Sequence, residues 1–275
     1  MEINLTLHKL IVKKQCFYIN NLVMKNKNYG ILNLRIIDNI IEKKRFEMLN
    51  ILRKYINTSQ INSFLDIGTT EDESLKSSNF FVKQFNYIST KKSISDQNIT
   101  NEKFKKVLKK SITSNFKENE IDLFRSDLVI SSATIEHVGS FENQKKMMEN
   151  IMKLSDRYFL ITTPYRFFPI DFHTKLPFLH MLPKSVHRKI LFIIGLKEYA
   201  KEENLNLLDY SSLNKIIHTQ KNENFKIKIF KINLFNVNIT YKTDFFVDLG
   251  AVKKGFYIIS CALNGEIITH KFVVY

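Results

Sequence analysis

Two histidines and an acidic residue lie where the chain could support proton transfer. Glu136 and His137 follow the apolar run Asp127–Ser131 by a few residues, and His173 lies in a proline-rich stretch further along. A histidine with a pKa near 6.5 suits the removal of a proton at neutral pH. His137 is therefore the first candidate for a general base and His173 the second. A solitary histidine is more often structural, and that interpretation stays open for both.

A short apolar segment that ends in an acid and a glycine is the second candidate for a site. Residues Ser63 to Gly68 read Ser-Phe-Leu-Asp-Ile-Gly, which predicts a buried strand. A glycine at the end of a strand lets the backbone approach a ligand closely, because a side chain at Gly68 would collide with that ligand. Asp66 either helps to hold the ligand or caps the turn that follows.

Other catalytic and metal-binding patterns are weak in this sequence. His173, His180 and His187 recur every seven residues, but prolines interrupt any helix that would align them. Without a cluster of cysteines or carboxylates beside them, we do not expect a metal site. The sequence has no Walker-type phosphate loop and no Gly-x-Ser-x-Gly nucleophile elbow. The full glycine fingerprint of nicotinamide-binding domains is missing as well.

The elements that must position these residues alternate between helices and strands. Apolar residues at helical spacing predict helices over 35–56 and around Phe80, and Ser140 is a good N-cap for another. Strands are predicted over 63–68, 87–94, 105–112, 127–131, 158–162, 227–235 and 256–274, the last with a hairpin turn at Asn264-Gly265. This alternation predicts an α/β fold with a mainly parallel sheet of about seven strands, antiparallel C-terminal strands and helices on both faces.

All four prolines fall between Pro164 and Pro183. Proline continues neither a helix nor a central strand, so this stretch is expected to leave the sheet beyond a strand end. Ligands of open α/β sheets bind outside the carboxyl ends of the strands. The aromatic stretch is therefore either a lid over a substrate or a hydrophobic flap on the core.

Composition limits the classes of function. The 275 residues are 44% hydrophobic and 25% charged, which is a globular mix. The net charge of +15 comes almost entirely from lysine spread along the chain, so nucleic acid is an unlikely partner. Two cysteines and no signal-peptide core favour the cytoplasm. The basic, apolar segment Lys184–Lys197 is either a core helix or a contact with a membrane surface.

Three segments, FLDIGTTED, DLVISSATIEHVGSFENQKKMMENIMKL and FLITTPYRFFPIDFHTKLPFLHMLPKSVHRKIL, resemble the class I S-adenosylmethionine-dependent methyltransferases. The similarity covers roughly residues 60 to 235 and is strongest to a bacterial branch associated with surface-polysaccharide biosynthesis. It implies a Rossmann-like methyltransferase domain over 61–240. A helical extension over 1–60 would precede this domain, and a β-hairpin extension over 241–275 would complete it.

The resemblance also implies roles for particular residues. Asp66 matches the acid that helps to hold the methionine amino end, Gly68 and Thr69 the cofactor turn, and Asp96 the ribose-binding acid, with Ser132 a further cofactor contact. Glu136 and His137 lie where the family faces methyl donor and acceptor. Thr69 to Asp72 replace the usual glycines, and Ser111 or Thr113 stands where an adenine-side acid is common.

The expected function is methyl transfer from S-adenosylmethionine to an oxygen of a small-molecule, saccharide or lipid-linked acceptor. Such a reaction needs alignment of donor and acceptor, exclusion of water and, for a hydroxyl, a base such as His137 or His173. The alternative is a scaffold or binding protein with the same fold that has lost catalysis. Peripheral membrane contact is a further expectation, and the oligomeric state is left open.

Overall fold

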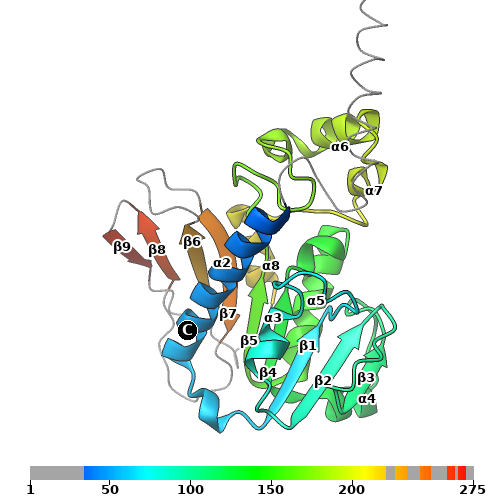
Figure 1. Ribbon diagram of the computed structural model, residues 1–275, viewed down its shortest axis with the longest axis vertical. Coiled ribbons are helices and arrows are strands. Elements are labelled where there is room, and N and C mark those ends of the chain that lie inside the picture. The colour runs from blue at the N-terminus through cyan, green and yellow to red at the C-terminus, as the bar shows by residue number, and fades with distance from the viewer. Residues whose placement is uncertain (1–33, 221–226, 234–241, 249–258, 264–265, 271–275) are drawn as a thin grey trace, which may run out of the picture.

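Figure 1 shows the computed structural model of the chain, which describes residues 34–220, 227–233, 242–248, 259–263 and 266–270. The Asn264-Gly265 turn and the first part of the predicted N-terminal extension lie outside these residues. None of the described helices is both long enough and apolar enough to cross a bilayer.

One sheet organises the described residues. Its strand order is β3-β2-β1-β4-β5-β7-β6-β8-β9. The strands are β1 Ser63–Ile67, β2 Thr90–Ser95, β3 Lys106–Lys109, β4 Ser126–Ser132, β5 Ser155–Thr162, β6 Ile227–Asn233, β7 Lys242–Asp248, β8 Ile259–Leu263 and β9 Glu266–His270. The first five in that order are parallel, and β7 lies antiparallel between β5 and β6. The predicted α/β class and the parallel pairing of β1 with β4 are confirmed, whereas the described sheet has nine strands instead of about seven.

Helices cover both faces of this sheet (Figure 1). They are α2 Leu34–Tyr55, α3 Phe80–Gln84, α4 Glu118–Phe124, α5 Phe141–Leu154, α6 Lys184–Ile193, α7 Lys197–Ala200 and α8 Tyr210–Thr219, with short turns η1 Thr58–Gln60, η2 Ile135–His137 and η3 Leu179–Met181. The predicted cap of α5 is confirmed, since Ser140 Oγ accepts a hydrogen bond from Asn143 N at 3.2 Å.

Alternating strand residues build two apolar cores, one on each face. Leu128 and Ile130 of β4 face α2 and α3 in one core. Val129, between them, joins α5 and α8 in the other. Strands buried on both sides are typical of a parallel sheet covered by helices.

The parallel strands bring four connections to one edge of the sheet. Gly68 follows β1, Asp96 follows β2, η2 follows β4, and the proline-rich segment follows β5. The strand order reverses between β1 and β4, which is the place where open α/β sheets bind ligands. Helices α6 and α7 lie beyond this edge (Figure 1).

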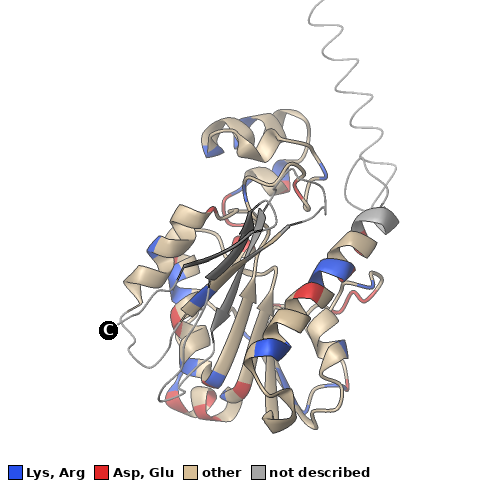
Figure 2. Cartoon of the chain, turned by 90° about the vertical axis from the view of Figure 1, so that its left-hand side faces the viewer, with Lys and Arg blue, Asp and Glu red and all other residues tan. Residues whose placement is uncertain are grey.

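Charged residues are distributed over several elements. Figure 2 shows Lys and Arg on helices at both sides of the sheet, with Asp and Glu among them. In this view they form no single basic face among the described residues, which agrees with the spread of lysine along the sequence.

Candidate active site

A cavity of about 430 Å³ lies at the carboxyl ends of β1, β2, β3 and β4. Its wall contains three of the residues predicted from the sequence, Gly68, Asp96 and His137. The other lining residues are Ile67, Ile94, Ser95, Gln97, Lys110, Ser111, Ile112, Thr113, Ala133, Thr134, Val138 and Asn143. Ser111 and Thr113 therefore lie in the region where the resemblance places the adenine.

Gly68 turns the chain out of β1 with φ +84°, a conformation that L side chains rarely adopt. A Cβ at this position would overlap the side chain of Thr134, which follows β4. We expected a glycine here because a side chain would collide with a bound ligand. The described neighbour with which a Cβ would collide is instead Thr134 of the protein itself.

Asp66 and Thr69 lie beneath this turn, buried, and they are not among the residues that line the cavity. Thr69 Oγ1 donates to Asp66 Oδ2 at 2.6 Å and is bonded in turn to Ser93 Oγ at 2.7 Å. Burial raises the pKa of Asp66 to about 6, although the Thr69 hydrogen bond and the charge of Arg45 on α2 act in the opposite direction. This is the geometry of a carboxylate that holds the following turn.

Ser132 lies at the end of β4 but is turned toward β5. Its hydroxyl lies 3.0 Å from Thr162 Oγ1, and Ser132 is not among the cavity residues. The structure therefore gathers Gly68, Asp96 and His137 at one cavity and leaves Asp66, Thr69 and Ser132 behind its wall.

Turn η2 presents Glu136 and His137 in different environments. Glu136 is fully buried, and its Oε2 accepts a hydrogen bond from Thr163 Oγ1 at 3.0 Å. Its Oε1 is buried and has no hydrogen-bond partner in the part of the chain that the structure describes. His137 is exposed, and its Nδ1 lies 2.7 Å from the carbonyl oxygen of Asn204. Because a carbonyl only accepts, Nδ1 carries the proton and Nε2 is left as an acceptor.

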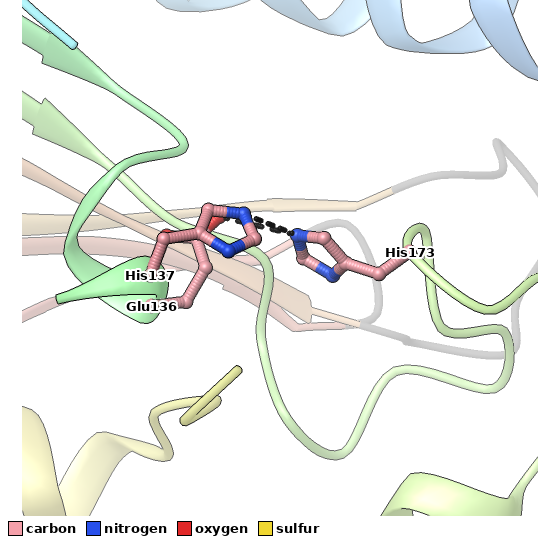
Figure 3. Close-up of side chains that lie close together, drawn as sticks. All are labelled: Glu136, His137 and His173. Carbon is pink, nitrogen blue, oxygen red and sulfur yellow. Dashed lines mark hydrogen bonds and ion pairs between the residues drawn. The ribbon is translucent and has the colours of Figure 1, made fainter. Parts of the chain in front are cut away.

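His173 reaches the same place from the proline-rich segment (Figure 3). Its Nε2 lies 3.0 Å from His137 Nε2 and 3.6 Å from Glu136 Oε1, and its Nδ1 lies 3.1 Å from Asp171 Oδ1. Two neighbouring acceptors, Asp171 and His137 Nε2, assign both ring protons to His173. Burial opposes this charge, but Asp171 and Glu136 raise the pKa of His173 to about 9.

The two candidate bases are thus partners of each other. His173 holds its protons at neutral pH, so His137 Nε2 is the basic nitrogen of the pair. Burial raises the pKa of Glu136, but the positive charge of His173, whose Nε2 lies 3.6 Å from Oε1, helps to bring it below its ordinary value. The imidazole of His137 is exposed at the cavity wall, so an acceptor could replace His173 at Nε2.

The aromatic residues of the proline-rich segment do not line the cavity. Phe168 is buried and stacks on Phe172 with ring centroids 5.2 Å apart. Phe167 is exposed and packs against the Arg166 guanidinium instead. In the described arrangement the segment meets the site through His173 and not through these aromatic rings.

Four contributors to this site were missed by the sequence reasoning. Asp171 orients His173, Thr163 holds Glu136, Asn204 fixes the tautomer of His137, and Arg45 lies close enough to affect Glu136 and Asp66. The Asp-Phe-His spacing could have indicated Asp171. Asn204 contributes a backbone carbonyl, for which its side-chain type gives no indication.

No protein-family model and no curated protein matches this chain. Among solved structures it is similar to the magnesium protoporphyrin IX methyltransferase ChlM of Synechocystis PCC 6803 with bound SAM, at 10% identity and a TM-score of 0.44 over 81% of this chain and 86% of that one. It is also similar to a SAM-dependent methyltransferase from Archaeoglobus fulgidus, at 14% identity and a TM-score of 0.44 over 76% of this chain and 94% of that one.

A third similar structure is the N-methyltransferase NodS of Bradyrhizobium japonicum WM9 in complex with SAH, at 8% identity and a TM-score of 0.44 over 76% of this chain and 87% of that one. All three similarities are to methyltransferase structures, and none exceeds a TM-score of 0.44 or 14% identity. The reaction and the acceptor of this chain have to be argued from its own residues.

Proposed function

We propose that this chain transfers a methyl group from S-adenosylmethionine to a hydroxyl of a small-molecule, saccharide or lipid-linked acceptor. The observation that carries the proposal is the single cavity that joins Gly68, Asp96 and His137 at the carboxyl ends of β1, β2 and β4. Asp96 lies where ribose-binding acids of doubly wound sheets lie, and an exposed carboxylate is suited to the two hydroxyls of a ribose.

The turn after β1 favours this cofactor over a dinucleotide. Dinucleotide sites place a pyrophosphate on the N-terminus of a helix that begins within the glycine-rich turn. Here α3 begins only at Phe80, and Asp38 of α2 accepts hydrogen bonds from Lys76 N and Ser77 N in the intervening segment. S-adenosylmethionine has no phosphate and does not need such a cradle.

The reaction then requires one proton transfer besides the methyl transfer. The acceptor hydroxyl would donate to His137 Nε2 in place of His173, and its oxygen would attack the methyl carbon as the carbon–sulfur bond breaks. The proton remains on His137, and S-adenosylhomocysteine leaves neutral at sulfur. Glu136 and Asp171 supply the negative charge that stabilises two neighbouring imidazolium rings.

Helix α6 supports the lipid-linked part of the proposal. Phe192 and Ile193 at its end are 58% and 66% exposed, while Leu191 is fully buried. Lys189 and Lys197 flank this apolar end, and such a combination is typical of contact with an anionic membrane surface. The other side of α6, with Leu191, is buried, as the interpretation of this segment as a core helix expects.

Cofactor binding tests the proposal directly. S-adenosylhomocysteine at 100 times its dissociation constant should raise the free energy of unfolding by about 2.7 kcal/mol, which a thermal shift detects. Asp96→Ala should weaken this binding by about 10-fold or more, because a charged hydrogen-bond partner of the ribose is lost. Asp122→Ala, a change at an exposed acid of α4, is the matched control.

If neither S-adenosylmethionine nor S-adenosylhomocysteine raises the unfolding temperature, the chain is better explained as a scaffold or binding protein that has lost catalysis. Full methyl transfer by His137→Ala on the true acceptor would remove His137 from the role of base. In a cofactor-binding enzyme that uses this base, the same variant should keep cofactor affinity and lose about 10²-fold or more in turnover.

A further inference from the structure

We propose that Glu136, His137 and His173 form a binding site for one divalent transition-metal ion of the Zn²⁺ type. Glu136 Oε1, His137 Nε2 and His173 Nε2 lie within 4.8 Å of one another (Figure 3). Two imidazole nitrogens and one carboxylate oxygen are a common donor set for zinc and other first-row transition metals. His180 and His187, which share a seven-residue spacing with His173, are not part of this group, whereas Glu136 and His137 of η2 are.

The spacing of the three donors fits a common metal ion. A ligand bond of about 2.1 Å places neighbouring donors about 3.0 Å apart in an octahedral site and about 3.4 Å apart in a tetrahedral one. The two Nε2 atoms are 3.0 Å apart, and His173 Nε2 lies 3.6 Å from Glu136 Oε1. These two separations match a bound metal, whereas the pair Glu136 and His137, within 4.8 Å, would have to draw closer together around it.

The second observation is the state of Glu136 Oε1. This oxygen is buried on a side chain with no exposed surface, and apart from the 3.6 Å contact with His173 Nε2 it has no hydrogen-bond partner among the described residues. A buried carboxylate oxygen without a partner is costly, so such atoms call for an explanation such as an ion. Oε1 lies 3.6 Å from His173 Nε2, and the ligand atoms of the three residues all lie within 4.8 Å of one another.

Each proposed ligand is also held by a partner at its other polar atom. Asp171 lies 3.1 Å from His173 Nδ1, the Asn204 carbonyl lies 2.7 Å from His137 Nδ1, and Thr163 donates to Glu136 Oε2 at 3.0 Å. Metal-binding histidines usually donate their second nitrogen in this way, since the bond fixes tautomer and orientation. All three ligands here have that support.

Two buried carboxylates, Glu136 and Asp171, lie at this group and would offset part of the charge of a metal ion. A metal ion would take the place of the Nε2 proton of His173, and that proton would pass to solvent. His137 is exposed at the cavity wall, so further coordination positions are open to a ligand there.

The role of this ion rests on the proposed methyl transfer, whereas its binding does not. An acceptor hydroxyl bound to the metal would lose its proton to solvent more easily, because a Lewis acid lowers the pKa of a bound oxygen. His137 would then be a ligand and no longer the base. Methyl transfer that stops on chelation and returns with Zn²⁺ would support this role, and transfer indifferent to chelators would assign the proton to His137 itself.

Binding of Zn²⁺ and Co²⁺ to the metal-depleted full chain tests the site without reference to activity. One ion per chain by elemental analysis, with a visible Co²⁺ spectrum, is the expected result. Asp171→Asn should lower the metal affinity by about 10–100-fold, which is the usual effect of losing a residue that supports a ligand. His137→Ala removes a ligand itself, so its affinity should fall by more than about 100-fold. His218→Ala, at an exposed histidine of α8, is the matched control and should bind like the unaltered chain.

Two outcomes would overturn the proposal. One is an unaltered chain that takes up less than one equivalent of either ion, and the other is a His137→Ala chain that binds as well as the unaltered one. His137 is exposed, so its replacement should not compromise folding. Thr163→Val removes only the hydrogen bond to Glu136 Oε2. The metal affinity of this variant should lie between those of the unaltered chain and of His137→Ala. Cofactor binding measured on the same samples separates this result from the proposed function.

Discussion

Asp66 combines burial with hydrogen bonding, and this makes the stability of the chain depend on pH. The pKa of Asp66 is raised from 3.8 to about 6 in the folded state, so the folded chain binds this proton more tightly than the unfolded one. Stability from this residue is therefore highest below pH 4 and falls as pH rises toward 6. The full cost above that pH is about 3 kcal/mol.

Asp66→Asn removes this titration and should become relatively more stable as pH rises. Denaturant unfolding of both chains at pH 4.5 and 7.5 measures the effect. The stability of the variant relative to the unaltered chain should increase by about 2 kcal/mol between the two pH values, because part of the titration already lies below pH 4.5. Parallel pH profiles would assign Asp66 an ordinary pKa.

Gly68 should tolerate no side chain, for two separable reasons. Its positive φ costs a non-glycine residue about 1–2 kcal/mol, and a Cβ would in addition overlap Thr134. Gly68→Ala should therefore destabilise the chain by more than the backbone cost alone. Adding Thr134→Gly to Gly68→Ala should relieve the overlap but leave the backbone cost. The free energies of unfolding of the single and double variants measure both contributions. Full recovery in the double variant would rule out strain at φ.

At the scale of elements, the cap of α5 should make a measurable contribution. Ser140 Oγ accepts a hydrogen bond from Asn143 N, an amide in the first turn of α5 that has no partner within the helix. Ser140→Ala should lower the free energy of unfolding by about 1 kcal/mol. Ser211→Ala, at an exposed position inside α8, should change it little. Equal effects of the two changes would deny the cap its role.

The exposed end of α6 should bind anionic membranes. Replacing Phe192 and Ile193 together by serine removes apolar surface from a helix whose other side stays packed through Leu191. Sedimentation with vesicles rich in phosphatidylserine should fall several-fold. Leu123→Ser, at an exposed apolar residue of α4, should leave it unchanged. If the unaltered chain, the double variant and Leu123→Ser sediment equally with the vesicles, α6 does not bind membranes through Phe192 and Ile193.

Much of this arrangement could be predicted from the sequence, because strands and their ends follow local pattern. The run around Val129 and the acid-glycine end of β1 are apolar segments with clear boundaries, and Gly68, Asp96 and His137 consequently meet at one edge. The contact of His137 with His173 depends on the path of the proline-rich segment. Local hydrogen bonds, such as the one that Thr174 Oγ1 donates to Asp171 Oδ2, shape this path. The path therefore cannot be read from the spacing of apolar residues in the sequence.

For the whole molecule, stability should depend on both faces of the sheet. Leu52 of α2 is fully buried against the core on the face of α3. Leu52→Ala should cost about 2–5 kcal/mol, because the cavity left behind collapses only in part. Met152→Ala tests the opposite face. Coincident transitions by fluorescence and circular dichroism in both variants would indicate one cooperative unit, and separated transitions would contradict it.

The position of β7 has a consequence for synthesis on the ribosome. β5 can pair with β4 early, but its other side waits for β7, whose register places Leu160 opposite Val247. β6 emerges before β7, yet it joins the sheet only through β7 and β8. At about 5–20 residues per second, the apolar edge of β5 stays open for several seconds in each nascent chain. Open edges of this kind pair readily with other chains, so production in cells should respond to chaperone supply and to slower translation.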